Sequence, residues 1–348
     1  MSLYAIDFFC GAGGLTRGLL DAGINVIAGI DNSLLCKETY EYNNSPARFI
    51  CEDIKTLNSD KVRELISAVS KEDLVFAACA PCQPFARLNK NGRNDDSRLL
   101  GSFANFLEIF LPKYVFIENV DGLKKVKGYS TYLRFKKRLS DLGYEYIESI
   151  LNAKDYGVPQ SRRRLILIAA RDIKPILPIK TNGKNLIPFN TVADAISKFP
   201  PIIAGESNSS IPNHKALRLS EKNLKRIKST SFDGGGRDDW NKDLWLDCHL
   251  KDPSGHSDVY GRMKWNQPSP TLTCKCCSLS NGRYGHPTQN RAISFREAAS
   301  LQSFNENYIF FANSKKDLGK QIGNAVPVRL AQAIGKSIVD LHESTKKG

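Results

Sequence analysis

The residue types best able to do chemistry in this chain stand in the stretch LVFAACAPCQPF, which runs from Leu74 to Phe85. A short apolar run, typical of a buried strand, leads into a loop that carries Cys79 and Cys82. Two thiols three residues apart are typical of a redox pair or of half a metal site. The same loop could instead be built around a single nucleophilic thiolate.

The redox and metal interpretations find little support elsewhere in the chain. A strand followed by CxxC is the thioredoxin layout, but this chain of 348 residues is much longer, a glycine loop precedes the motif, and Pro84 follows Cys82 closely. Further cysteines and histidines could supply zinc ligands, but no CxxC pair is matched by a second one at finger-like spacing. The sequence therefore predicts no bound metal. The ligands considered are Cys248, His249, His256, Cys274, Cys276, Cys277 and His286.

The single-nucleophile interpretation fits the neighbouring residues better. Pro81 and Pro84 flank Cys82 and stiffen the loop, which fixes the thiol at the edge of the predicted sheet. Glu118, in FIENV, ends the next predicted strand, so strand order would bring its carboxyl beside Cys82. A thiol and an acid over a cofactor crevice indicate covalent catalysis with proton donation.

A glycine loop near the N-terminus predicts the cofactor crevice. In DFFCGAGGL, Gly11, Gly13 and Gly14 lie between a predicted strand and a predicted helix. Glycines at these positions permit a tight turn and a close approach of a ligand to the backbone. The loop is neither GxGxxG nor a nucleotide-hydrolase loop. Asp31 and Asp53 stand at or near the ends of the next two strands, where acids accept hydrogen bonds from a nucleoside. Each acid could instead be a helix cap or a turn residue.

The first half of the chain alternates apolar runs with amphipathic segments, which predicts an α/β fold with a doubly wound, largely parallel sheet. The predicted strands are Leu3–Phe9, Asn25–Ile30, Leu74–Ala77, Tyr114–Ile117, Tyr144–Leu151 and Leu165–Ala170. The predicted helices are Leu15–Asp21, Leu34–Tyr42, Asp60–Val69, Phe103–Phe110 and Tyr132–Leu142.

The character of the chain changes near Ile173. From there to about Pro270 it is rich in Pro, Gly, Ser and Asn, and only Leu219–Ile227, with Ser220 as its cap, predicts a helix. Tryptophans and phenylalanines supply core material, so we expect a second, irregular domain and not disorder. Helical periodicity returns at Ser294–Gln302 and Val328–Leu341.

Charge predicts the kind of partner. Fifty Lys and Arg against 36 Asp and Glu give a net charge of +14 and a pI near 9.3. Such an excess favours a polyanion, although a protein can also be basic without such a partner. No apolar run approaches the ~20 residues of a membrane span, and the N-terminus lacks the pattern of a signal peptide. These features predict a cytoplasmic protein with no membrane partner.

Six motifs, in order, closely resemble those of the DNA cytosine-C5 methyltransferases, in the form found in bacterial modification enzymes. They are DFFCGAGGL, APCQPF, FIENV, QSRRR, RAISFREAASLQSF and QIGNAVP, spread from Ile6 to about Val328. The resemblance implies a Rossmann-like large domain that binds S-adenosyl-L-methionine (SAM), a smaller target-recognition domain, and double-stranded DNA as the partner. It places the large domain at residues 1–172 and 328–348, and the small domain at 173–327 with its recognition region at about 173–273.

The resemblance assigns roles residue by residue. Cys82 matches the nucleophile, Glu118 the acid at the cytosine N3 edge, and Arg164 of QxRxR the arginine near the cytosine carbonyl, with Arg162 of the same motif included in the catalytic set. Gln83, Gln160 and Thr271 match positions that meet DNA. The expected SAM-binding residues are Phe9, Gly11, Gly13, Gly14, Asp31, Asp53, Asn324 and Val326. Cys10 and the Ala86–Arg87 pair after PCQPF depart from the family pattern.

The chemistry implied by the resemblance is methyl transfer to C5 of a flipped-out cytosine through a covalent bond between Cys82 and C6. We expect a monomer that belongs to a restriction-modification system, or stands alone, and makes no direct contact with an endonuclease. Two alternatives remain open: a catalytically dead homologue that only binds DNA, and methylation of tRNA. The intact PCQ, ENV and QxRxR argue against the first, and the long recognition stretch against the second.

Overall fold

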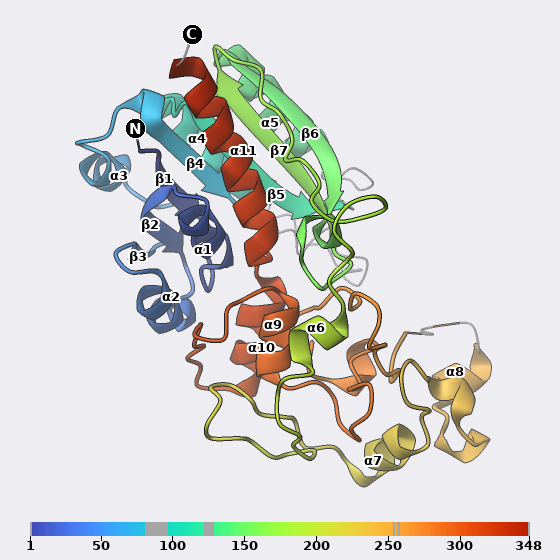
Figure 1. Cartoon of the computed structure of the whole chain (residues 1–348). Coiled ribbons are helices and arrows are strands. Elements are labelled where there is room, and N and C mark those ends of the chain that lie inside the picture. The colour runs from blue at the N-terminus through green and yellow to red at the C-terminus, as the bar shows by residue number, and fades with distance from the viewer. Residues whose placement is uncertain (1, 81–96, 122–128, 253–254, 256–257, 347–348) are drawn as a thin grey trace. The chain divides into compact units, whose positions relative to one another are not determined.

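The computed structural model describes residues 2–80, 97–121, 129–252, 255 and 258–346. They form two compact units, which Figure 1 shows as ribbons. Unit 1 comprises residues 1–156, 163–181 and 326–348, and unit 2 comprises residues 157–162 and 182–325. The residues from Gly157 to Arg162, which include the start of QxRxR, thus belong to unit 2, whereas residues 173–181 belong to unit 1.

Unit 1 is built on one seven-stranded sheet with the order β3-β2-β1-β4-β5-β7-β6. The first five strands in that order pair in parallel, and β7 runs antiparallel to both β5 and β6. The sheet confirms the α/β, doubly wound prediction. The strands are β1 (Tyr4–Phe8), β2 (Asn25–Asp31), β3 (Arg48–Cys51), β4 (Leu74–Ala78), β5 (Tyr114–Val120), β6 (Tyr144–Asn152) and β7 (Arg163–Arg171).

Helices cover both faces of this sheet. Helices α1 and α11 pack against each other, in front of the sheet in Figure 1, while α4 and α5 lie behind it. Every residue of β4 is buried, as expected for a central strand with helices on both sides. The helices are α1 (Gly14–Asp21), α2 (Lys37–Asn44), α3 (Ser59–Leu65), α4 (Ser97–Phe110), α5 (Tyr129–Asp141) and α11 (Val328–Lys346).

Aromatic side chains fill the core behind the sheet. The ring of Phe8 lies edge-on to Phe76 and Phe103, with centroids 5.2 and 5.1 Å apart. Phe103 also stacks on Phe135 of α5. These contacts fix α4 and α5 against β1 and β4, the two strands whose carboxyl ends precede the glycine loop and the PCQ loop.

Unit 2 contains short helices joined by irregular segments, and no β-strand is found among its described residues. The predicted helix after Ser220 is confirmed, with the Ser220 hydroxyl accepting from the backbone N–H of Asn223. Trp240 is buried with Ile227 and Tyr260, and Trp245 packs against this group. The helices are α6 (Val192–Ile196), α7 (Glu221–Lys228), α8 (Asp247–Lys251), α9 (Phe295–Leu301) and α10 (Lys315–Asn324).

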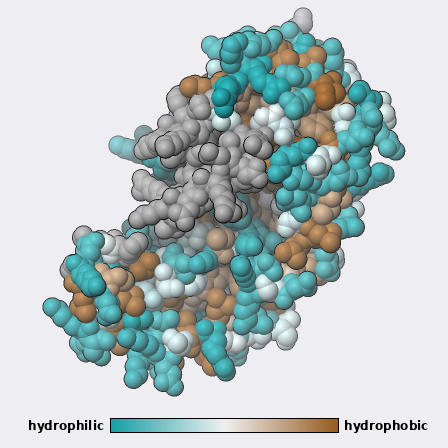
Figure 2. Space-filling model, turned by 180° about the vertical axis from the view of Figure 1, so that it is seen from behind, coloured by the Kyte–Doolittle hydropathy of each residue, from teal (hydrophilic) through white to brown (hydrophobic). Residues whose placement is uncertain are grey.

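The surface is mostly polar. On the face seen in Figure 2, hydrophilic residues predominate outside the grey area and hydrophobic ones occur in small groups. Among the described residues, no helix has the length and apolar character needed to span a bilayer.

Two glycines of unit 1 provide a test of this packing. A Cβ added at Gly18 of α1 would lie 2.4 Å from the Ala331 Cβ and 2.6 Å from the Val328 carbonyl, whereas one at Gly101 of α4 would meet nothing within 4 Å. Gly18→Ala should therefore lower the free energy of unfolding by about 2 kcal/mol. Gly101→Ala should raise it by about 0.5 kcal/mol, because alanine favours the helix. Urea titration measures both; equal effects would contradict the close approach of α1 and α11.

Candidate active site

The glycine loop joins β1 to α1 through a sharp backbone turn. Phe9 has a positive φ of 62°, Gly11 one of 50° and Gly13 one of 87°, and α1 begins at Gly14. The turn is closed by a hydrogen bond from the Gly13 N–H to the Cys10 carbonyl (2.9 Å). A Cβ at Gly11 would meet nothing within 4 Å, so open space lies above its backbone at the start of a helix.

Asp31 ties this loop to the neighbouring strand. Its carboxylate ends β2 and accepts from the backbone N–H of Gly11 (2.9 Å) and of Ser33 (2.8 Å). Burial raises the pKa of Asp31, although these two hydrogen bonds partly counter the effect. The predicted residues Phe9, Gly11 and Asp31 are therefore brought together at the carboxyl edge of the sheet.

The other predicted cofactor residues are less closely connected. Asp53 follows β3, two residues after the Asp31–Cys51 pair of the ladder, and its carboxylate accepts from the Lys55 N–H (2.9 Å), as a turn residue does. Val326 is buried in unit 1, just before α11, and Asn324 is the last residue of α10 in unit 2.

Glu118 and Arg164 form an ion pair on adjacent strands. Glu118 of β5 lies opposite Ile166 of β7, and Arg164, two residues from Ile166, faces the same side of the sheet. The Arg164 Nε lies 2.9 Å from the Glu118 Oε1, and their side chains are only 13% and 10% exposed. The structure thus joins the two residues that the motifs ENV and QxRxR predict to meet the same base.

The PCQ loop leaves the sheet beside this pair. Cys82 and Gln83 lie outside the described residues, but the loop's first residues are described. The Cys79 N–H donates to the Phe8 carbonyl (3.2 Å), which extends the pairing of β4 with β1. On the other side, the Asn119 amide approaches the Ala80 carbonyl (3.5 Å). Asn119 therefore links the base of the loop to the residue next to Glu118.

Arg162 and Gln160 form a buried polar clamp within unit 2. The Arg162 guanidinium donates to the carbonyls of Leu272 (2.8 Å), Gly323 and Ala325 (both 3.3 Å). The Gln160 amide accepts from the Leu272 N–H (2.9 Å) and donates to the side-chain oxygen of Gln302 (2.9 Å).

Gln302 completes the clamp. Its side-chain nitrogen donates to the Ile322 carbonyl (2.8 Å), next to the carbonyl that Arg162 binds. The clamp therefore joins QxRxR, the segment at Leu272, the LQSF segment and the GNAV segment. LQSF is one of the six motifs, but no role is predicted for its Gln302. The contact of this amide with Gln160 depends on the fold and leaves no local pattern in the sequence.

The clamp bears on two of the predicted roles, those of Arg162 and Gln160. Arg162 is 3% exposed and Gln160 is 0% exposed, and their polar groups are directed at the protein's own backbone. These contacts favour a positioning role for Arg162 over the predicted catalytic one, and they direct the Gln160 side chain at protein groups and not at the predicted DNA contact. Strand β7 begins only at Arg163, so residues 160 and 162 precede the strand.

Thr271 lies at the edge of the clamp. Its hydroxyl donates to the Ser161 carbonyl (2.7 Å), and its side chain is partly exposed. Next to it, Gly323 packs so closely that a Cβ there would lie 2.0 Å from the Thr273 carbonyl. The SPTLT and GNAV segments are thus in backbone-to-backbone contact.

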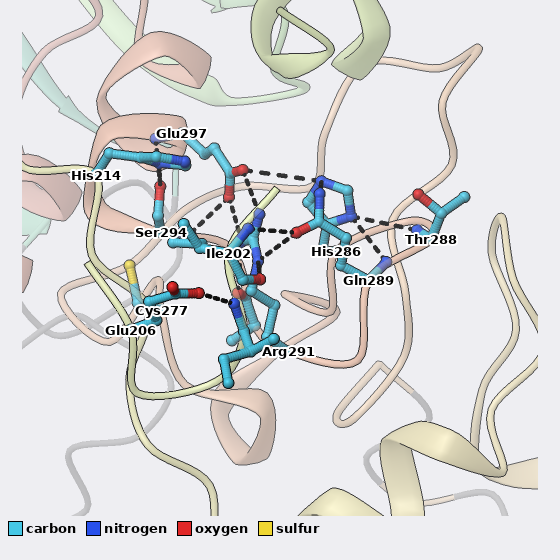
Figure 3. A network of polar contacts seen from close by, with 12 residues as sticks. Ile202, Glu206, His214, Cys277, His286, Thr288, Gln289, Arg291, Ser294 and Glu297 are labelled. Atoms are coloured by element: carbon cyan, nitrogen blue, oxygen red, sulfur yellow. Dashed lines mark hydrogen bonds and ion pairs between the residues drawn. The ribbon is translucent and has the colours of Figure 1, made fainter. Parts of the chain in front are cut away.

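A second buried network holds the FREAAS helix of unit 2 (Figure 3). Arg291 and Glu297, both almost fully buried, form a bidentate pair with two N···O distances of 2.7 Å. Burial alone would raise the pKa of Glu297, but the Arg291 bonds and charge lower it overall. Glu297 also accepts from the backbone N–H of Ser294 as part of a capping box.

His286 is the neutral member of this network. Burial lowers its pKa to about 4, outweighing the nearby Glu297 carboxylate. Its Nδ1 accepts from the backbone N–H groups of Thr288 (3.2 Å) and Gln289 (3.1 Å), which requires an unprotonated Nδ1. Among the described residues, no three histidines, cysteines or acids are arranged to hold a metal ion.

A doubly wound sheet with a glycine loop after β1 is shared by SAM-dependent methyltransferases and dinucleotide-binding proteins. The structures that resemble this chain place it in the first class. Solved structures agree: an E. coli prophage-encoded protein described as a DNA modification methyltransferase matches 98% of this chain and 99% of its own, with a TM-score of 0.78 at 22% identity. A Spodoptera frugiperda DNMT2 mutant matches with a TM-score of 0.64 at 16% identity over 98% and 99% of the two chains.

Sequence comparison identifies the family. The model of the C-5 cytosine-specific DNA methylases matches residues 3–340. The Type II methylase M.HgiDII of Herpetosiphon aurantiacus is 39% identical over 96% of this chain and 94% of its own length. The Type II methyltransferase M1.HphI of Haemophilus parahaemolyticus is 33% identical over 98% of this chain and 88% of its own length. The chain therefore belongs to the C-5 cytosine-specific DNA methylases and is a DNA (cytosine-5-)-methyltransferase.

The different surroundings of Arg162 and Arg164 predict different effects of removing them. Arg162→Ala should lower the free energy of unfolding by about 3 kcal/mol, because buried carbonyls lose their donor. Arg164→Ala should also lower the free energy of unfolding, because it leaves the nearly buried Glu118 carboxylate without its partner, and it should in addition reduce kcat strongly, even under conditions where the variant is folded. Denaturant titration and methyl-transfer kinetics measure the two effects. A stable but inactive Arg162→Ala enzyme would restore the catalytic assignment.

His286 predicts a specific pH dependence of stability. The unfolded imidazole titrates near 6.5 and the folded one near 4, so between these values the unfolded state binds more protons and stability falls as the pH is lowered. Relative to a His286→Gln variant, the protein should lose up to about 3 kcal/mol between pH 6.5 and pH 4. Urea titrations of both proteins across this range test it. Parallel curves for the two would show that His286 does not titrate as assigned.

Proposed function

We propose that this enzyme methylates C5 of a flipped-out cytosine in a specific duplex sequence, with SAM as methyl donor and Cys82 as the covalent nucleophile. The observation that carries this proposal is the Glu118–Arg164 pair at the base of the PCQ loop. Because Ala78 of β4 pairs with Ile117 of β5, the loop and Glu118 leave from neighbouring strand ends.

The residues after β1 and β2 fit an adenosyl cofactor. The open space above Gly11 and the first N–H groups of α1 suit a ligand that approaches the backbone closely. Asp31, with its lone pairs only partly used by Gly11 and Ser33, suits ribose hydroxyls, and Asp53 follows the adjacent strand. When bound there, SAM would supply the electrophilic methyl group that C5 receives.

The chain's own residues would activate the base. Cytosine C5 is a poor nucleophile, and addition of the Cys82 thiolate at C6 turns the ring into an enamine whose C5 is nucleophilic. Glu118 would hydrogen-bond the N3 edge, where charge develops, and Arg164 would hold both Glu118 and the O2 side of the ring. After methylation, loss of the C5 proton and elimination of the thiolate release the product.

DNA binding would follow from charge and from base flipping. The target atom of a stacked cytosine cannot be reached, so the base has to leave the helix. The net charge of +14 favours binding to the phosphate backbone. Relatives named Type II methyltransferases support a place in a restriction-modification system, in which we expect the enzyme to act as a monomer in the cytoplasm, without contact with an endonuclease.

A suicide substrate tests the covalent step. Fluorine at C5 cannot leave as a cation, so the reaction should stop with enzyme, methyl group and DNA joined. Long DNA synthesised with 5-fluorocytosine in place of cytosine contains the target whatever its sequence. Incubation with SAM should give a complex that survives SDS, and omission of SAM should greatly reduce it.

Matched cysteine variants identify the nucleophile. Cys82→Ser should abolish both the complex and methyl transfer, whereas Cys79→Ala should retain most of both. Robust methylation of ordinary DNA with no denaturation-resistant complex would refute the thiolate mechanism. Loss of activity in Cys79→Ala as complete as in Cys82→Ser would favour the redox-pair interpretation instead.

A further inference from the structure

Helix α7 of unit 2 has one buried side and one strongly basic side. Arg226 and Ile227 are buried, whereas Lys222, Lys225 and Lys228 are exposed. The three lysines are spaced three residues apart, so their side chains lie along one side of the helix. Within the described part of the chain, none of the three pairs with a carboxylate. Their charge is therefore available to a partner.

The segment that follows α7 displays an aromatic side chain. Phe232 is 61% exposed, in the sequence SFDGGG. We call residues 231–236 the Phe232 loop. It is close-packed, because a Cβ at Gly234 would lie 2.5 Å from the Lys264 side chain and one at Gly235 would lie 2.3 Å from the Ser231 carbonyl.

Hydrogen bonds hold this loop in one conformation. The Asp239 carboxylate accepts from the backbone N–H of Ser231 (2.9 Å) and Gly236 (3.0 Å). The Asp233 N–H donates to the Pro287 carbonyl (2.9 Å). The Arg283 guanidinium donates to the carbonyls of Gly234 (2.9 Å) and Gly235 (3.0 Å). The exposed ring is therefore carried by a fixed backbone.

Buried Arg262 joins the helix and the loop. Its guanidinium donates to the Ile227 carbonyl (2.7 Å) and the Thr230 carbonyl (3.0 Å) at the end of α7, and its backbone N–H donates to the Gly235 carbonyl (3.0 Å). The same guanidinium lies 4.8 Å from the centroid of the Phe232 ring. The lysine row and the aromatic ring thus form one preorganised element.

Such an element matches the chemistry of duplex DNA. Lysines that lack carboxylate partners bind phosphates and position a protein without reading sequence. A phenylalanine on such a loop can make apolar contacts with a thymine methyl group or with a base step. Because the loop backbone is already fixed by hydrogen bonds, little conformational entropy is lost on binding.

We propose that α7 and the Phe232 loop form the DNA-docking element of this enzyme, in which Lys222, Lys225 and Lys228 contact phosphates and Phe232 contacts bases of the recognition sequence. This inference rests on the proposed function and deepens it, since it names a residue that determines the target. Within the predicted recognition region of about 173–273, it assigns sequence discrimination to one side chain and sequence-independent affinity to three others.

Two sets of variants separate these roles. For Phe232→Ala, methylated positions in genomic DNA are read by bisulfite sequencing, and kcat/KM is measured on a duplex with the wild-type target. We expect the methylated sequence to lose discrimination at one position and kcat/KM to fall about tenfold, with partial recovery in Phe232→Leu. Ile109→Ala, which removes an exposed apolar side chain of α4 in unit 1 (47% exposed), outside the predicted recognition region, should behave as the wild type.

The lysine set is tested by the salt dependence of binding. Replacing Lys222, Lys225 and Lys228 with Gln should reduce the slope of log K against log salt by about 2.7, because each phosphate contact contributes about 0.9. The weakening should be equal for duplexes with and without the target. A matched triple Gln variant at three exposed lysines of unit 1 outside the recognition region, Lys37, Lys71 and Lys336, should keep the wild-type slope.

Each outcome has a definite meaning. An unchanged methylated sequence together with wild-type kcat/KM in Phe232→Ala overturns the base contact, and an unchanged slope in the α7 variant overturns the phosphate contact. If Phe232→Ala lowers the melting temperature, Phe232→Leu decides between folding and recognition. If the wild type methylates no DNA, the proposed function fails, whereas the salt slopes still report on docking.

Discussion

The arrangement of the motifs depends on buried side chains that bind main-chain groups of other segments. Arg162 and Gln302 donate to adjacent carbonyls of the GNAV segment, and Gln160 binds Leu272 on the other side. A buried carbonyl without a donor is costly, so these three side chains fix where the segments lie. In unit 1, Asp31 does the same for the glycine loop through the Gly11 N–H.

The sheet supplies the complementary constraint. Parallel strands β1, β2 and β4 place their carboxyl ends at one edge, and β5 adds Glu118. The antiparallel β7 then returns along β5, which is what brings Arg164 to within 2.9 Å of Glu118. An all-parallel sheet would place the start of the next strand at the opposite edge. The reversed strand is therefore required to form this ion pair.

Much of this could be predicted from the sequence because strands and helices are local patterns. Apolar runs located β1, β2, β4 and β5, and Ser220 marked the start of α7. The roles of Gln160 and Arg162 could not be predicted, because they depend on main-chain N–H and carbonyl groups more than 100 residues away in the chain. Composition does not distinguish a guanidinium that binds its own backbone from one that binds a nucleotide.

The clamp has a consequence for how such an enzyme changes its target. Arg162 and Gln160 hold the segment at Leu272 by its carbonyl and N–H, groups that every amino acid except proline provides. Side chains in the stretch leading up to it are not needed for that attachment. If that stretch is the recognition region, as proposed, its side chains can change over evolution without loss of the main-chain contacts that attach it to QxRxR.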